Sequence, residues 1–202
     1  MADNSEVEKY LTVARNGEGR LTEKMSRFLA FAFEVGSADE AKALVKKFAN
    51  DYHDARHVCW AYVVGPRRAD YLSSDNGEPS GTAGKPILGQ INSLGLTNVV
   101  VIVVRYFGGI KLGTPGLIAA YRESARLALD DAGIKEVTRT ETLRFSVPYA
   151  SYDKVMRLIK DRELRILGQQ IEMDCVTEIE VPVALLSEVT DRLEKINGLK
   201  MI

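Results

Sequence analysis

Six consecutive aliphatic residues, Val99 to Val104, constrain the fold more than any other feature of the chain. The run is far shorter than the about 20 apolar residues that a membrane-spanning helix needs. Together with its neighbours it predicts a strand over residues 98–107, the most hydrophobic strand of the chain and a central one. Residues 57–64 are also apolar on both alternating faces, a pattern typical of a strand buried on both sides. We therefore expect a protein built around a buried sheet.

The composition is that of an ordinary soluble protein. Hydrophobic residues make up 46% and charged residues 27% of the 202 residues. Both fractions are close to the averages of globular proteins, which excludes a disordered or fibrous chain. Residues Met1–Glu6 lack the basic flank and the apolar core of an export signal. Cys59 and Cys175 match no paired metal or redox spacing. We therefore expect a cytoplasmic protein with reduced thiols, without a disulfide framework and without a membrane partner.

The formal net charge is only −1, so the overall charge does not indicate a polyanionic partner. Any role in binding nucleic acid must therefore depend on a local basic patch. The length allows one large domain or two small ones, and nothing in the sequence specifies the oligomeric state.

Local signals predict an alternation of strands and helices in residues 1–140. A capping box at Ser37–Glu40 opens the first helix, and a turn-rich segment at Asn16–Gly19 separates the first two strands. The predicted strands cover residues 10–13, 28–35, 57–64, 98–107 and 134–140, and the predicted helices run from Ser37 to about Asn50, from Pro86 to about Ser93 and from Pro115 to Ala132.

From residue 143 onward the pattern changes to strand, helix, strand, strand, helix and strand. These elements cover residues 143–147, 149–163, 166–173, 175–181, 184–196 and 199–202. Their βαββαβ order is the ferredoxin-like arrangement, and about 60 residues suffice for a small domain. We therefore predict two domains, an α/β domain over residues 1–140 and an α+β domain over residues 141–202.

Two glycine-rich loops carry the most informative residues. The first glycine loop (residues 73–85) carries Lys85, and the second glycine loop (residues 108–113) carries Lys111 and follows Arg105. Each loop leads into a predicted helix, and exposed amides, a helix dipole and a nearby cation together form an anion site. The alternative is that the glycines serve only positive-φ turns. The candidate anion-binding residues are Lys85, Arg105, Lys111, Gly81, Thr82, Gly108, Gly109, Gly113 and Thr114.

The first glycine loop resembles a Walker A loop only superficially. Pro79 stands at the position of the first glycine, and Pro86 stands where a magnesium-binding Ser or Thr is needed. This excludes nucleotide hydrolysis of that type. The loop's polar side chains could be acid/base groups or magnesium ligands, or they could serve turn geometry and loop hydrogen bonds. The possible cleft residues are His57, Asp75, Glu78, Ser80 and Tyr106.

His57 and Cys59 lie on one face of their predicted strand. Their Cα atoms are about 6.8 Å apart, whereas a nucleophile and its base need hydrogen-bond reach. His57 therefore either points into a cleft or lies satisfied in the core beside a buried thiol. Only two histidines exist, so we predict no metal site. We also predict no cofactor. The remaining choice concerns aromatic residues that either stack on bases or pack in the core, namely Trp60, Tyr62, Tyr106 and Phe107.

Three segments together resemble the signature of the YigZ/IMPACT family. They are His57–Tyr62, Asp75–Leu88 and Arg105–Gly113, within a signature region from about His57 to Tyr121. The resemblance implies a ribosomal-protein-S5 domain-2-like N-terminal domain. It also implies that the ferredoxin-like second domain is similar to the last domain of elongation factor G. Two positions depart from the family pattern: Pro115 stands where many members have glycine, and Ala120 stands where many have arginine, which removes one cation from the expected patch.

The resemblance also implies a function, because eukaryotic members of the family are translation regulators that act by protein–protein competition. We therefore predict a binding protein rather than an enzyme, with RNA or a ribosome-associated protein as its partner. The alternative is an enzyme acting on a phosphorylated or carboxylated small molecule in the same loops. We expect Lys85, Arg105 and Lys111 to form one basic surface. In the alternative arrangement Arg105 is an interior residue paired with Asp75 or Glu78.

Overall fold

The computed structural model describes residues 7–202, so Met1–Glu6, in which we expect no export signal, lie outside the described residues. Lys9–Val137 form one compact unit, the N-terminal unit, and Thr138–Ile202 belong to a second, the C-terminal unit. Among the helices of residues 7–202, none has the length and hydropathy needed to cross a membrane.

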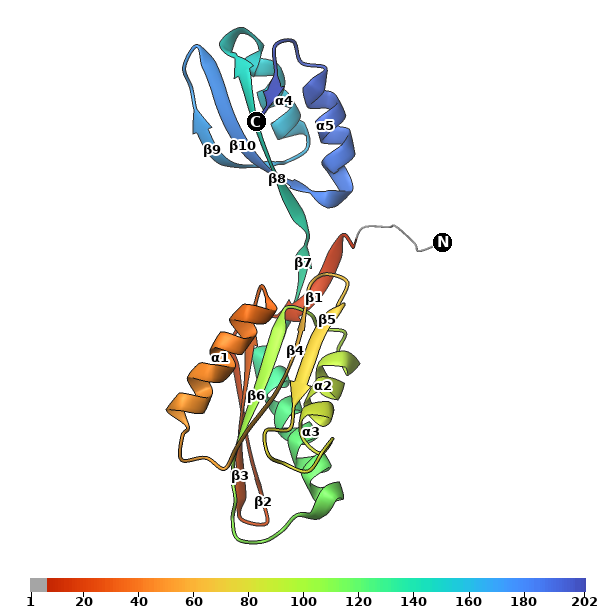
Figure 1. The fold of residues 1–202 in the computed structure, drawn as a ribbon. Coiled ribbons are helices and arrows are strands. Elements are labelled where there is room, and N and C mark those ends of the chain that lie inside the picture. Colours follow the sequence, from red (N-terminus) through yellow and green to blue (C-terminus); the bar gives the residue numbers. More distant parts are fainter. Residues whose placement is uncertain (1–6) are drawn as a thin grey trace. The chain divides into compact units, whose positions relative to one another are not determined.

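The N-terminal unit contains a five-stranded antiparallel sheet with the order β2-β3-β6-β4-β5. Figure 1 shows α1 on one side of this sheet and α2 and α3 on the other. The predicted central strand is confirmed, because β6 is the middle strand. The elements of the unit are β1 (Lys9–Val13), β2 (Gly17–Glu23), β3 (Ser26–Glu34), α1 (Ala38–Asp51), β4 (His57–Val64), β5 (Asp70–Ser74), α2 (Gly84–Ser93), β6 (Val99–Tyr106), α3 (Gly113–Ala132) and β7 (Ile134–Thr138), which pairs with β1.

The central strand β6 supplies side chains to two cores. The odd-numbered residues of Val99–Val104 pack with residues of α2 and α3, and the even-numbered residues pack on the side of α1. All six are fully buried. Since burying one such side chain contributes about 1.5–3 kcal/mol, this strand is a main source of the unit's stability.

The capping box predicted at the start of the first helix is present. The Ser37 hydroxyl accepts a hydrogen bond from the Glu40 amide at 3.2 Å, and the Glu40 carboxylate accepts one from the Gly36 amide at 2.7 Å. The helix ends at Asp51, one residue beyond the predicted end.

The turn expected at Asn16–Gly19 is wrong, because Gly17 and Gly19 belong to strand β2. A Cβ atom on Gly17 would lie 2.2 Å from the carbonyl oxygen of Ala128, and one on Gly19 would lie 2.7 Å from the amide nitrogen of the same residue. These glycines are therefore required for the close approach of α3 to β2, and not for a turn.

Two helices begin earlier than the sequence predicted. α2 begins at Gly84 rather than at Pro86, and α3 begins at Gly113 rather than at Pro115. Thr114 therefore lies in the first turn of α3 and does not cap it. A proline is tolerated in a first turn because the amides there have no partner within the helix.

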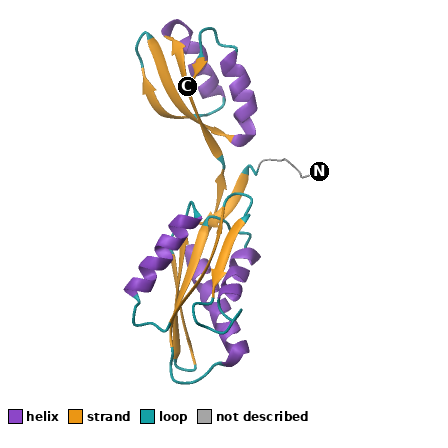
Figure 2. Cartoon of the chain, viewed as in Figure 1, coloured by secondary structure: helices purple, strands orange, loops and turns teal. Residues whose placement is uncertain are grey.

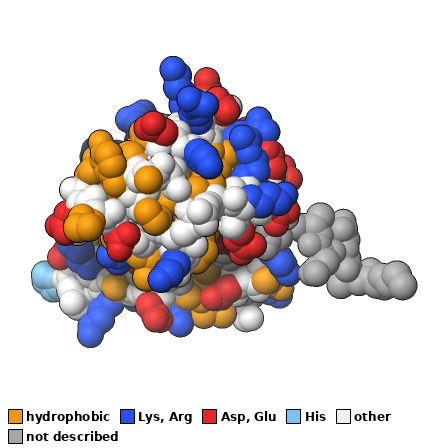
Figure 3. All heavy atoms as spheres, turned by 90° about the horizontal axis from the view of Figure 1, so that it is seen from above, with side chains coloured by type: hydrophobic (Ala, Val, Ile, Leu, Met, Phe, Trp, Pro, Cys, Tyr) orange, Lys and Arg blue, Asp and Glu red, His pale blue; other side chains and the backbone are white. Residues whose placement is uncertain are grey.

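The C-terminal unit has the predicted order of six main elements, and the predicted strand over residues 134–140 is instead divided between β7 and β8. Figure 2 shows the strands and the two helices of this unit. The sheet has the strand order β11-β8-β10-β9, and side chains of both helices share one core with it. The face drawn in Figure 3 mixes cationic with acidic side chains, so it presents no field of one sign. The elements are β8 (Thr140–Pro148), α4 (Tyr152–Asp161), β9 (Arg165–Gln170), β10 (Asp174–Pro182), α5 (Leu186–Glu194) and β11 (Lys200–Met201), with short 3-10 turns before α4 and α5.

Replacement of Gly17 by alanine is expected to lower the free energy of unfolding by about 1–3 kcal/mol, because the added methyl group overlaps the α3 backbone. The matched control is Gly89→Ala in α2, where an added Cβ would meet no atom of the described residues within 4 Å. That change should raise the free energy of unfolding by about 0.5–1 kcal/mol. Urea denaturation measures both, and equal stabilities of the two variants would contradict the close approach of α3 to β2.

Candidate ligand cleft of the N-terminal unit

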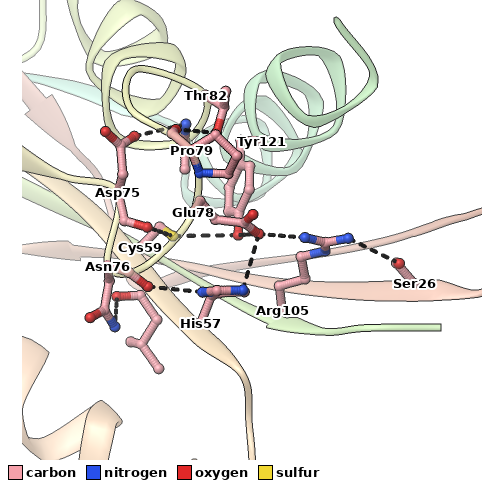
Figure 4. Close-up of polar contacts among 12 residues, drawn as sticks. Ser26, His57, Cys59, Asp75, Asn76, Glu78, Pro79, Thr82, Arg105 and Tyr121 are labelled. Carbon is pink, nitrogen blue, oxygen red and sulfur yellow. Dashed lines mark hydrogen bonds and ion pairs between the residues drawn. The ribbon is translucent and has the colours of Figure 1, made fainter. Parts of the chain in front are cut away.

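A cluster of buried polar side chains joins β4, β6, α3 and the first glycine loop (Figure 4). Glu78 Oε1 accepts hydrogen bonds from Arg105 Nη1 at 2.5 Å and from the Tyr121 hydroxyl at 2.9 Å. It also lies 3.8 Å from His57 Nε2. The side chains of Arg105 and Glu78 are only 6% and 3% exposed. One carboxylate therefore holds the loop against two strands and a helix.

Strand register places His57 and Arg105 side by side, because they are directly paired across β4 and β6. His57 Nδ1 lies 2.9 Å from the backbone oxygen of Asn76. A carbonyl oxygen only accepts, so Nδ1 carries a proton and donates it to this bond. This contact fixes the ring orientation and leaves Nε2 on the side of Glu78.

The Asp75 carboxylate organises the first glycine loop. It accepts hydrogen bonds from the amides of Gly81 at 2.7 Å, Ala83 at 3.0 Å and Gly84 at 2.8 Å. Burial favours a higher pKa for Asp75, but these bonds and the charge of Lys85 outweigh it and lower the pKa below its ordinary value of 3.8. Because α2 has no side-chain cap of its own, Asp75 serves as its anionic cap from outside the helix.

The amides of the first glycine loop are therefore not open to an external anion, contrary to the arrangement that the sequence predicted for Gly81 and Thr82. The Thr82 hydroxyl donates to the Pro79 carbonyl at 2.6 Å, so it too is used within the loop. Asn76 and Gly77 have φ angles of 38° and 84°, which agrees with the turn interpretation of Asp75–Gly77.

Cys59 is buried behind this loop and donates to the Asp75 backbone oxygen at 2.9 Å. Burial raises the pKa of Cys59 to about 12, so the sulfur remains a thiol at neutral pH. Burial also raises the pKa of Tyr121, whose hydroxyl keeps its proton and donates it to Glu78. Neither group is prepared to act as a nucleophile.

A cleft of about 480 Å³ opens beside the buried cluster. His57, Glu78 and Arg105 contribute its buried part. The exposed part of its lining comes from the residue before β4, the residue after β6, the second glycine loop and the first turn of α3. It includes Arg56, Phe107, Lys111, Gly113 and Thr114.

The exposed part of the cleft is suited to an anion. Arg56 and Lys111 form no ion pair with any part of the chain from residue 7 onward. Among residues 7–202, no side chain caps the N-terminus of α3, and the first turn of this helix contains no acidic residue. Two unpaired cations and an uncapped helix terminus therefore meet at one opening.

The structure separates the three cations that were expected to share one surface. Lys111 lines the cleft just described, whereas Lys85 lines a different one with Gly81, Gln90 and Arg122. Arg105 is buried and paired with Glu78, which is the alternative arrangement, with Glu78 and not Asp75 as its partner. A single basic surface of these residues does not exist.

The structure places the remaining predicted site residues, Gly108, Gly109, Ser80 and Tyr106, in different environments. The Gly108 amide donates to the Ser26 hydroxyl at 3.2 Å, and a Cβ on Gly108 would lie 2.1 Å from the Met25 backbone. Gly109 has a φ of 88°, and a Cβ added there would meet no atom of residues 7–202 within 4 Å. Ser80 is exposed. The Tyr106 hydroxyl donates to Asp54 at 2.8 Å, on the side of the sheet that α1 covers.

Only one of the four aromatic residues considered for base stacking lines the cleft. The rings of Trp60 and Tyr62 stack on each other in the core on the α1 side, with their centroids 5.8 Å apart. Phe107 is 44% exposed at the cleft.

The sequence did not single out Arg56 or Tyr121, because a lone arginine and a tyrosine within an apolar helix face carry no local signal. Among residues 7–202, no three His, Cys, Asp or Glu side chains converge as metal ligands.

Comparisons with known proteins agree with one another. The model of the Impact N-terminal domain matches residues 24–129. The chain is 34% identical to IMPACT family member YvyE of Bacillus subtilis (strain 168), over 88% of this chain and 81% of that protein. It is 33% identical to IMPACT family member YigZ of Escherichia coli (strain K12), over 84% of each. A crystal structure described as that of a hypothetical protein has a TM-score of 0.71 at 29% identity, covering 96% of this chain and 97% of that one.

Replacement of Asp75 by asparagine is expected to lower the free energy of unfolding by about 2–4 kcal/mol at pH 7, because an amide cannot accept all three bonds. The pKa of Asp75 is lower in the folded state, so its contribution is complete above the unfolded-state pKa and is lost as the pH falls through the folded value. The deficit of the variant should therefore shrink below about pH 4. Urea denaturation between pH 7 and pH 2.5 measures this, with Asp51→Asn at the exposed end of α1 as the control. A deficit that is independent of pH would contradict the assignment.

Replacement of Arg105 by alanine leaves the Glu78 carboxylate buried without its cation, so we expect the free energy of unfolding to fall by about 3–5 kcal/mol. Adding Glu78→Gln to this variant should restore part of the loss, since no buried charge then remains. Lys111→Ala is the control and should change stability by less than about 0.5 kcal/mol. Equal losses for Arg105→Ala and Lys111→Ala in chemical denaturation would show that the buried pair is not formed.

Proposed function

Because this chain belongs to the IMPACT family, we propose that it is a binding and regulatory protein of translation rather than an enzyme. Its partner in this proposal is RNA or a ribosome-associated protein. The observation that carries the proposal is the meeting of Arg56 and Lys111 with the N-terminus of α3 at one cleft, where the described part of the chain supplies neither an ion pair for these cations nor a side-chain cap for the helix. We place this activity in the cytoplasm, in keeping with the free thiols of Cys59 and Cys175.

The chemistry of the cleft favours phosphate groups of a partner. A helix N-terminus offers amide donors and a positive dipole end, and lysine or arginine beside it adds full charge. The net charge of the chain is close to zero, so such a local arrangement is required for binding a polyanion.

A second candidate function is catalysis on a phosphorylated or carboxylated small molecule. The observation that favours it is the presence of His57 and Glu78 inside a cleft of ligand size. Against it, Cys59 and Tyr121 hold their protons, and Glu78 is engaged by two hydrogen bonds. The binding function accounts for this arrangement without a further reacting group.

The two units also support a finer proposal about domains. We propose that residues 1–140 form an IMPACT-type domain of the ribosomal-protein-S5 domain-2-like fold. Residues 141–202 would form a ferredoxin-like domain similar to the last domain of elongation factor G. Its support is the βαββαβ order and the strand order β11-β8-β10-β9, and the family model matches only residues that lie in the first domain.

The domain proposal predicts that residues 1–140 and 143–202, expressed separately, each unfold in one cooperative transition. The reason is that each unit has its own hydrophobic core. Circular dichroism during thermal unfolding measures this, and two unfolded fragments would contradict the boundary.

The binding proposal predicts an affinity for single-stranded RNA, or sedimentation with ribosomes, that falls steeply with added salt. Lys111→Glu should weaken this association about tenfold or more, because it reverses one charge at the cleft. The matched control is Lys46→Glu on α1, which covers the opposite face of the sheet from α3. Equal binding by both variants would contradict a role for the cleft. Saturable thermal stabilisation by a metabolite without RNA or ribosome association would favour the enzyme.

A further inference from the structure

The guanidinium of Arg105 has a buried donor without a partner. Nη1 donates to Glu78 and Nη2 donates to the Ser26 hydroxyl at 3.4 Å. Nε is buried, and no atom of residues 7–202 accepts a hydrogen bond from it. Unsatisfied buried N–H groups are rare and unfavourable, so they indicate a place where a ligand or a water completes the structure. Arg105 lines the cleft, and this points to an acceptor that enters from there.

The exposed lining of the cleft provides a phosphate subsite. Lys111 is exposed there and forms no ion pair within residues 7–202. Gly113 and Thr114 contribute the first amides of α3, which is 20 residues long and therefore has a full dipole. A phosphate group at this point would meet a cation and a helix N-terminus together.

Phe107 provides a stacking surface next to this subsite. It is 44% exposed at the cleft, and Cζ of Arg105 lies 5.6 Å from its ring centroid. An exposed aromatic ring beside a cation is a typical platform for a nucleobase.

The buried part of the cleft provides acceptors for a hydroxyl group. The proton of His57 is on Nδ1, so in the neutral ring Nε2 has a free lone pair, and Glu78 Oε1 lies 3.8 Å away. A carboxylate is the group that commonly holds a ribose hydroxyl in nucleotide-binding proteins. The cleft volume of about 480 Å³ lies within the range of small-molecule sites.

We propose that this cleft binds one phosphorylated ribonucleotide unit, with its phosphate at Lys111 and α3 and its base on Phe107. A ribose hydroxyl would accept a hydrogen bond from the unpartnered Nε of Arg105 and donate its own proton to His57 or Glu78. The inference rests on the proposed function, because it assigns a ligand to the same cleft. The unit is either a free nucleoside monophosphate or the phosphorylated end of an RNA strand, since both present the same chemistry.

The first experiment is calorimetric titration of the full chain with adenosine 5′-monophosphate, its deoxy analogue lacking the ribose hydroxyls at 2′ and 3′, adenosine, and inorganic phosphate. We expect the monophosphate to bind most tightly. Loss of the phosphate (adenosine), of the hydroxyls (the deoxy analogue) or of the whole nucleoside (inorganic phosphate) should each weaken binding about tenfold or more. Equal affinities for the monophosphate and inorganic phosphate would overturn the proposal. Short RNAs with and without a 5′-phosphate form a second arm that identifies the source of the unit.

Two exposed positions test the site without disturbing the core. Phe107→Leu and Lys111→Ala should each weaken binding of the monophosphate about tenfold. Tyr71→Leu, at an exposed aromatic residue on β5, and Lys46→Ala on α1 are the controls and should bind as the wild type does. Thermal unfolding of all four variants shows whether they remain folded. Unchanged binding by Phe107→Leu and Lys111→Ala would overturn the proposal.

The outcomes separate this proposal from the one on which it rests. Ribosome or RNA association that persists when no mononucleotide and no phosphorylated RNA end binds the cleft overturns the nucleotide site and leaves the proposed function standing. Binding of the mononucleotide without RNA or ribosome association supports the nucleotide site and overturns the proposed partner.

Discussion

The buried ion pair between Glu78 and Arg105 is the interaction on which the cleft depends. Glu78 belongs to an irregular loop, and Arg105 belongs to the end of the central strand. Since a buried charge without a partner is strongly destabilising, the loop can close over the sheet only in the register that pairs the two groups. Tyr121 adds a hydrogen bond from α3 to the same carboxylate oxygen. A strand, a helix and a loop thus share one acceptor, and the relative positions of the cleft residues follow from it.

A second carboxylate makes this arrangement possible. Asp75 folds the first glycine loop on itself by accepting three of its amides, and this holds Glu78 at the correct distance from β4 and β6. The two carboxylates therefore have different tasks, one toward the loop backbone and one toward the cleft. The first glycine loop, which superficially resembles a Walker A loop, binds the carboxylate of its own Asp75 through its amides. The open helix terminus is the one that follows the second glycine loop.

Local patterns were sufficient to predict most of the fold. The apolar run of β6, the buried strand β4 and the capping box of α1 are recognisable from neighbouring residues alone. Gly17 and Gly19 were misinterpreted as a turn because their role depends on α3, more than a hundred positions away. For the same reason the sequence located both loops but could not decide the partner of Arg105. That partner depends on strand register and on burial, and neither is encoded in spacing.

The structure shows where the two departures from the family pattern, Ala120 and Pro115, lie. Ala120 is 2% exposed within α3, so the lack of an arginine there does not remove a cation from the exposed lining of the cleft, as the sequence suggested. Pro115, in contrast, is exposed in the first turn of α3. Because proline has no N–H, this terminus offers one amide fewer than a glycine would provide at the same position. If the cleft binds an anion as proposed, recognition would therefore rely more on the side chains of Arg56 and Lys111 than it would with glycine at position 115.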